Sequence, residues 1–172
     1  MTDYEKIYQT NPAACGEPFA VFVDFFKSYP HKNATVLDLG CGQGRDAVFI
    51  GRLGHSVHAV DISPSGIAQL VKMAAQENLA IHGETADIVT YQPQQTYAVV
   101  LLDRVIHMLA TDDKIDVLKK ASAAVESSGY LLIADTPSNL PLFDTFFDSP
   151  NWNIVLKQKG FRFLQKLENI HV

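Results

Sequence analysis

The chain has 172 residues, of which 47% are hydrophobic and 19% charged, a composition typical of globular proteins and not of disordered or fibrous ones. Its longest wholly apolar runs, such as residues 98–102, are about a quarter of the length that crosses a membrane, so we expect no membrane protein. Fourteen basic and nineteen acidic residues give a net charge of −5, which argues against a nucleic acid as the partner.

Cysteine content and the first residues bear on the cellular compartment. Cys15 and Cys41 are too few for a disulfide framework and lack the spacing of a metal site. Free thiols suit a reducing compartment, and the acidic opening segment is not a secretory signal, so we predict a cytoplasmic location. His58 and His82 fall inside predicted strands, where we expect structural roles, and we expect no bound metal.

The pattern of apolar residues predicts the class of fold. Short apolar runs alternate with helical patterns, which is typical of parallel strands joined by crossover helices. Most of the runs are almost continuously apolar, as expected of strands that are covered on both faces. The predicted strands are residues 35–39, 56–61, 80–85, 98–102 and 130–134.

Capping residues predict where helices begin and end. Ser63 is expected to cap a helix that has Pro64 at its first position, and Thr111 is expected to cap a later one. Gly54 is expected to end the helix that follows the first strand. A further helix, over residues 18–28, is predicted ahead of that strand.

Two interpretations fit the last forty or so residues. Residues 151–158 and 161–166 form a strand hairpin in the first, with its turn at Lys159 and Gly160. In the second, a helix ends at Lys159 and one strand begins at Phe161. We favour the hairpin, although periodicity alone does not separate the two over so short a segment.

The most informative segment follows the first predicted strand, which has Asp38 near its end and is followed by Gly40, Gly42 and Gly44. Glycines allow the backbone to approach a ligand closely, and the start of the next helix points amide donors at it. The spacing is Gly-x-Gly-x-Gly and not the Gly-x-Gly-x-x-Gly of dinucleotide binders. Because the Asp38 carboxylate would repel a pyrophosphate, a ligand with a cationic amine is favoured over NAD; the alternative is a tight turn without a ligand.

Two further acids follow the next two predicted strands. Asp61 ends the second strand, where it can accept hydrogen bonds from ribose hydroxyls. Asp87 follows the third strand and can receive an adenine amino group, with Ile62 and Ile88 covering the faces of the ring. A single acid at such a place is more often a helix cap or a loop residue, but acids after three consecutive strands favour a ligand site at this edge of the sheet.

The order of Asp38, the glycine turn, Asp61 and Asp87 resembles the motif series of class I S-adenosylmethionine-dependent methyltransferases over about residues 4–137. Within that superfamily, residues 42–46 and the predicted helix over residues 67–79 are most similar to the tellurite-resistance and thiopurine-type small-molecule branch.

The resemblance implies an α/β fold: a Rossmann-like, doubly wound, mostly parallel sheet of about seven strands, the last one antiparallel, with helices on both faces. It implies a single methyltransferase domain over residues 1–172. Residues 1–30 would form an N-terminal helix and lid, 34–137 the cofactor-binding core, and 138–172 a C-terminal helix and strand hairpin.

By similarity, the cofactor is S-adenosylmethionine. The residues expected around it follow the first four predicted strands. They are Asp38 at the amine, Gly40, Cys41 and Gly42 at the methionine part, Asp61 at the ribose, Ile62, Asp87 and Ile88 at the adenine, and Leu102.

The fourth strand and the loop after it occupy the acceptor side in the family. A thiolate or chalcogenide acceptor needs no base, whereas a neutral hydroxyl or amine needs one, and His107 is the best candidate, with Asp103 and Asp135 behind it. The alternative for His107 is a packed loop residue. The residues expected to bind the acceptor are Tyr4, Tyr8, Arg104 and Asp135.

The resulting hypothesis is methyl transfer to a small-molecule acceptor by in-line displacement at the sulfonium methyl. Two observations favour a small acceptor: the short chain leaves little room for a recognition domain, and residues 102–105 replace the Asn/Asp-Pro-Pro-Tyr signature of enzymes that methylate amino groups in nucleic acids or glutamine. Residues 4–16 are predicted to become ordered with the cofactor. The alternatives are a non-catalytic S-adenosylmethionine-binding or interaction module and, less favoured, an NAD(P)-dependent oxidoreductase.

Overall fold

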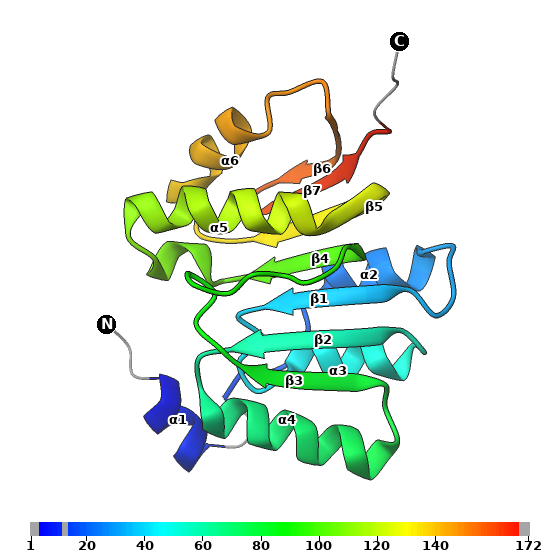
Figure 1. Ribbon diagram of the computed structural model, residues 1–172, viewed down its shortest axis with the longest axis vertical. Helices are drawn as coiled ribbons and strands as arrows, with labels where there is room; N and C mark the ends of the chain where they lie inside the picture. Colours follow the sequence, from blue (N-terminus) through cyan, green and yellow to red (C-terminus); the bar gives the residue numbers. More distant parts are fainter. Residues whose placement is uncertain (1–3, 12–13, 169–172) are drawn as a thin grey trace. The chain divides into compact units, whose positions relative to one another are not determined.

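The structure is a computed structural model that describes residues 4–11 and 14–168 (Figure 1). Parts of the predicted lid and of the predicted C-terminal region, residues 1–3, 12–13 and 169–172, lie outside the described residues. The backbone divides into two compact units, residues 1–91 and 92–172.

The first unit contains the parallel strands β1 (Thr35–Leu39), β2 (Ser56–Asp61) and β3 (Ile81–Thr85), in the order β3-β2-β1. The bounds of β1 and β2 are those predicted, and β3 begins one residue later than predicted. Four of the five residues of β1 are buried, as its continuous apolar pattern indicates.

Four helices of the first unit are described: α1 (Tyr4–Thr10), α2 (Ala20–Ser28), α3 (Arg45–Arg52) and α4 (Pro64–Glu77). The predicted start of α4 is confirmed, because the Ser63 hydroxyl accepts a hydrogen bond from the backbone N–H of Gly66 at 3.0 Å and Pro64 is the first helical residue. The predicted end of α3 is also confirmed, with Gly54 just beyond it at a φ of 89°. The helix α1 was not predicted.

The helices α3 and α4 pack on the same face of this sheet. A Cβ atom on Gly51 of α3 would lie 2.9 Å from the side chain of Ile81, and one on Gly83 of β3 would lie 2.9 Å from the side chain of Val71 in α4. Because side chains alternate between the two faces along a strand, the even-numbered residues of β3 lie on the opposite face.

The second unit contains β4 (Tyr97–Asp103), β5 (Val125–Ala134), β6 (Trp152–Gln158) and β7 (Phe161–Lys166), in the order β4-β5-β7-β6. The strand β5 runs parallel to β4, and β7 runs antiparallel to both β5 and β6. The hairpin of β6 and β7 is therefore the correct interpretation of the C-terminal segment. In β6 the pairing register shifts between Ile154 and Leu156, which marks a bulge.

The prediction placed the start of β5 at residue 130, five residues too late. Its first part contains the exposed residues Glu126, Ser127 and Ser128, which interrupt the apolar pattern, and Ser128 has a positive φ of 63°. Pairing with β4, which begins with Val125 opposite Tyr97, makes this polar segment part of the strand.

The helical segments of the second unit are η1 (Ile106–Met108), α5 (Thr111–Ala124), η2 (Pro137–Asn139) and α6 (Leu140–Phe146). The predicted cap of α5 is wrong, because Thr111 is its first helical residue and Ala110 occupies the cap position. Asp112 and Asp113 lie in the first turn, where negative charge is favourable at the positive end of the helix dipole. Among the described residues, no helix has the length and apolar content needed to cross a membrane.

Candidate functional site

The glycine turn between β1 and α3 is the centre of the first unit's candidate site. Gly40, Gly42 and Gly44 have φ values of 78°, 57° and 81°, a region that favours glycine. The backbone N–H groups of Gly40 and Cys41 both donate to the carbonyl of Val60, at 2.7 and 3.1 Å. The turn is therefore held against the end of β2, beside Asp61.

Two close approaches explain why the turn has glycine at position 42. A Cβ atom there would lie 2.6 Å from the hydroxyl of Tyr8 and 3.2 Å from the Sγ atom of Cys15. From the other side, a Cβ atom on Gly66 would lie 2.6 Å from the carbonyl oxygen of Gly42. The turn is thus enclosed between α1 and the first turn of α4.

Asp38 lies near the end of β1 and is buried, with only 2% of the residue exposed. Its Oδ2 atom has no hydrogen-bond partner within residues 4–11 and 14–168. Burial raises the pKa of Asp38 well above its ordinary value; repulsion from Asp46 adds to this, and attraction to Arg45 opposes it. A buried oxygen without a donor fits a ligand that brings a cationic N–H group to it.

Asp61 ends β2 and is held beside the glycine turn. Its Oδ2 atom accepts a hydrogen bond from the backbone N–H of Gly42 and its Oδ1 atom accepts one from that of Ser63, both at 2.8 Å. Burial raises the pKa of Asp61, and these two hydrogen bonds oppose the change. Each carboxylate oxygen retains capacity for a second donor, which is what recognition of a pair of hydroxyls requires.

The remaining predicted cofactor residues differ in exposure. Asp87 is exposed, and its Oδ1 atom accepts a hydrogen bond from the backbone N–H of Val89 at 2.9 Å, so it holds the loop after β3. Ile62 is 66% exposed and Ile88 is 8% exposed. The exposed Ile62 side chain is suited to covering an aromatic ring.

Cys41 and Leu102 are both buried. Burial raises the pKa of the Cys41 thiol well above its ordinary value, so its thiolate is disfavoured and it is unsuited to nucleophilic catalysis. Leu102 lies near the end of β4 in the second unit and is fully buried.

The helix α1 is held to α4 by Glu5, a residue that no sequence motif marks. Its carboxylate accepts hydrogen bonds from the Ser63 hydroxyl, from the Ser65 hydroxyl at 2.5 Å and from the Ser65 backbone N–H at 3.2 Å. These bonds lower the pKa of Glu5 to about 2. The partners lie 58 and 60 positions away, so no local pattern marks the interaction.

Two glutamines add to this attachment. Gln69 of α4 donates to the carbonyl of Tyr8 at 2.7 Å, and Gln43 of the glycine turn donates to the carbonyl of Asn11 at 2.6 Å. Gln43 also donates to the side-chain oxygen of Gln69 at 2.7 Å. The segment that carries Tyr4 and Tyr8 is therefore bonded to both the turn and α4.

We expect the attachment of α1 to weaken in acid. Because the pKa of Glu5 is lowered from 4.5 to about 2, its contribution is complete above pH 4.5 and is lost as the pH falls towards 2. Glu5→Gln should reproduce that loss at neutral pH, and tryptic cleavage after the exposed Lys6 should become severalfold faster. Glu77→Gln removes a carboxylate that pairs with Arg52 elsewhere in the unit, and it should leave the cleavage rate unchanged. Equal rates in wild type and Glu5→Gln would contradict this role of Glu5.

In the second unit the structure brings His107 and Asp135 together. The Oδ2 atom of Asp135 accepts a hydrogen bond from the His107 backbone N–H at 3.1 Å and lies 3.5 Å from its Nδ1 atom. The Asp135 side chain is fully buried and its Oδ1 atom accepts further bonds from Thr136 and Asn139, whereas the His107 side chain is 30% exposed. The carboxylate is fixed, and the partly exposed imidazole beside it can exchange a proton with a ligand.

Asp103 and Arg104 follow at the end of β4. Asp103 is half-buried, and Arg104 is exposed with a positive φ of 55°. The backbone N–H of Arg104 donates to the carbonyl of Ala134 at 2.8 Å, which fixes this unusual conformation. The turn directs the chain from β4 into the segment that carries His107.

Comparison with known protein families gives one family model over most of the chain. Residues 26–150 match the model described as "Tellurite resistance protein TehB". The match includes β1 to β5, the glycine turn and His107.

Two curated relatives match this chain over part of their own length. The chain is 34% identical over 116 residues to "Hemagglutinin 1" of Eikenella corrodens, which covers 64% of this chain and 39% of that protein. It is 32% identical over 143 residues to "Probable S-adenosyl-L-methionine-dependent methyltransferase TehB" of Haemophilus influenzae, covering 78% of this chain and 48% of that protein. The chain thus spans less than half the length of these two relatives.

The crystal structure of TehB from Haemophilus influenzae superposes on this chain with a TM-score of 0.75 at 20% identity, covering 88% of this chain and 63% of that one. The superposition confirms the predicted Rossmann-like α/β fold.

Proposed function

The chain belongs to the family of the tellurite resistance protein TehB, and on that basis we propose that it transfers a methyl group from S-adenosylmethionine to a small-molecule acceptor. The observation that carries the proposal is the buried Oδ2 atom of Asp38, which has no hydrogen-bond partner in the described part of the chain, two residues before the glycine turn. A cationic amine is the group that such an atom binds best.

The donor would be held by residues of the first unit. Asp38 accepts a hydrogen bond from the amine, and the backbone of Gly40, Cys41 and Gly42 allows close approach of the methionine part. The Asp61 carboxylate accepts hydrogen bonds from the ribose hydroxyls. It uses the lone pairs that its two hydrogen bonds from backbone N–H groups leave available. The proposed adenine contacts are Ile62, Asp87 and Ile88.

When bound, S-adenosylmethionine supplies a methyl group that is already activated by its positive sulfur. The protein's contribution is then orientation of the acceptor and exclusion of water. Tyr4, Tyr8 and Arg104 are proposed to position the acceptor. The hydrogen bonds that attach α1 to α4 support this role, because they hold Tyr8 against the glycine turn.

His107 is the proposed general base for acceptors that must lose a proton. It takes the proton on its imidazole, and the buried Asp135 carboxylate orients the ring and stabilises the positive charge. Asp103 is proposed as a second acidic group behind His107. A thiolate or another anionic acceptor has no proton to lose, so for such acceptors His107 and Asp135 would have a positioning role only.

A small acceptor is favoured over nucleic acid by the net charge of −5 and by Leu102-Asp103-Arg104-Val105 in place of the Asn/Asp-Pro-Pro-Tyr signature. The length of the chain lends no support, since the matched segment covers only 39% and 48% of these two relatives. A non-catalytic S-adenosylmethionine-binding module is the second candidate. One observation favours it. Asp135 accepts hydrogen bonds from Thr136 and Asn139, which is typical of a structural residue that holds a loop and not of a catalytic one.

Ligand-induced changes in melting temperature test donor binding. S-adenosylmethionine and S-adenosylhomocysteine should each stabilise the protein, by about 2.7 kcal/mol at a hundred times their Kd, and NADH should not. Asp61→Ala should remove most of the effect of both, whereas Asp24→Ala, an exposed change on α2, should leave it intact. A larger shift with NADH, or an undiminished shift in Asp61→Ala, would contradict the proposed donor site.

Formation of S-adenosylhomocysteine separates the enzyme from the binding module. It should be followed with thiols, chalcogen oxyanions, phenols and amines as acceptors. Product with any of these supports methyl transfer, and a His107→Gln loss restricted to phenols and amines supports the base. Donor binding without product from the whole panel favours the binding module.

A further inference from the structure

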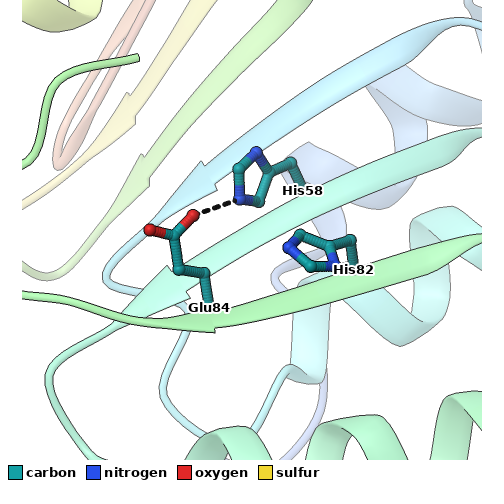
Figure 2. A group of neighbouring side chains, drawn as sticks. All are labelled: His58, His82 and Glu84. Atoms are coloured by element: carbon teal, nitrogen blue, oxygen red, sulfur yellow. Dashed lines mark hydrogen bonds and ion pairs between the residues drawn. The ribbon is translucent and has the colours of Figure 1, made fainter. Parts of the chain in front are cut away.

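We propose that His58, His82 and Glu84 bind a divalent transition metal ion of the zinc type between β2 and β3. The three side chains are shown in Figure 2. They belong to the first unit and take no part in the proposed methyl transfer. The sequence alone predicts no metal, because the cysteines lack the spacing of a metal site and the two histidines fall in separate strands.

Strand register places the three residues together. His58 of β2 is the direct partner of His82 in the parallel ladder, so both side chains leave the sheet on the same face. Glu84 follows His82 by two positions in β3 and therefore shares that face. This is the face opposite α3 and α4, since Gly83 meets the side chains of α4.

The distances fit a common ion. The Nε2 atom of His58 lies 2.9 Å from the Oε2 atom of Glu84, and all three ligand atoms lie within 4.8 Å of one another. Ligand atoms around a tetrahedral zinc ion lie about 3.3 Å apart, given bonds of about 2.0–2.1 Å. The largest contraction needed is about 1.5 Å, which side-chain rotation can supply.

The chemistry of the three groups also fits. Two neutral imidazoles and one carboxylate carry a single negative charge and favour zinc, cobalt, nickel or copper over magnesium or calcium. Three protein ligands leave a position for water, as in many zinc sites. The His58–Glu84 hydrogen bond uses two of these groups, and the imidazole of His82, 4.9 Å from that of His58 between ring centres, supplies the third ligand.

The three side chains are exposed enough for an ion to enter, and one of them is buried enough to have a restricted orientation. Glu84 has a side-chain exposure of 41% and His82 is exposed, so an ion can reach the site from solvent. The His58 side chain is 21% exposed, and the ring of Tyr91 packs edge-on against it at 6.1 Å, which restricts its orientation. A bound ion would join β3 to β2 through side chains in addition to the backbone ladder.

Metal titration of the full chain, after treatment with a chelator, tests the proposal. We expect one Zn²⁺ per chain by calorimetry, a rise in melting temperature with Zn²⁺, and visible d–d absorption with Co²⁺. His82→Asn and Glu84→Gln should each weaken Zn²⁺ binding by at least about tenfold. Glu84→Gln keeps an acceptor for His58, so it preserves the fold while removing the anionic ligand.

His31→Asn and Glu126→Gln are matched controls, because both remove an exposed group of the same type at another place. Their Zn²⁺ affinity should equal that of wild type. Equal affinity in His82→Asn, Glu84→Gln and the controls would overturn the proposal. An intense thiolate-to-cobalt band would also overturn it, because that band places the ion on a cysteine. The result is independent of donor binding.

Discussion

Asp38→Asn is expected to stabilise the ligand-free protein and to weaken binding of the donor. The carboxylate is buried with one oxygen unpartnered in the described residues, an arrangement that opposes folding while it is charged. Removing that charge should raise the free energy of unfolding at neutral pH by about 1–2 kcal/mol. Loss of a charged hydrogen bond to the amine should weaken donor binding about 10- to 100-fold.

The pH dependence of stability tests whether the charge of Asp38 causes the difference between wild type and Asp38→Asn. Because the folded-state pKa of Asp38 is raised above 3.8, the folded chain holds a proton that the unfolded chain releases. Wild-type stability should therefore fall relative to Asp38→Asn as the pH rises from about 4 through the folded-state pKa. Urea unfolding across this range and donor calorimetry measure the two effects, with Asp24→Asn as an exposed control. A loss of both stability and affinity would show that the carboxylate supports the ligand-free fold.

Gly44→Ala is expected to destabilise the protein far more than Gly54→Ala. Both glycines have a positive φ, 81° and 89°, so both substitutions carry the same backbone strain of about 1–2 kcal/mol. At Gly44 the new Cβ would also overlap the Cδ1 atom of Leu70, a fully buried side chain of α4, whereas at Gly54 no atom of the described structure lies within 4 Å. Overpacking adds about 1–3 kcal/mol at Gly44 alone.

Urea unfolding of the two variants measures the difference directly. The total loss should be about 2–5 kcal/mol for Gly44→Ala and about 1–2 kcal/mol for Gly54→Ala. Leu70→Val in the Gly44→Ala background, which shortens the opposing side chain, should show a favourable coupling. Equal losses in the two single variants would mean that the contact between the glycine turn and α4 adjusts without penalty.

Features that depend on nearby residues were the ones predicted from sequence. Ser63 and Pro64 mark the start of α4 through a bond that spans three positions, and the apolar runs of β1 and β2 fix both strands. The sequence also predicted the glycine turn, and the structure places Asp61 beside it through the bond to Gly42.

Features that depend on distant partners were missed. The role of Glu5 requires serines about sixty positions away, and the start of β5 is determined by pairing with β4 and not by its polar residues. His58 and His82 looked like separate strand residues, because only the register of β2 with β3 brings them together. These interactions become visible once the strands are aligned.

The bulge in β6 has a consequence for the behaviour of the protein at high concentration. The strand pairs with β7 on one side and exposes Ile154 and Val155, which are 47% and 48% exposed. A straight apolar strand of this kind would offer a template for strand pairing between copies, the first step of aggregation. The irregular register after Ile154 and the charged Lys157 interrupt that template. The outer strand β6 therefore disfavours pairing with a strand of another chain.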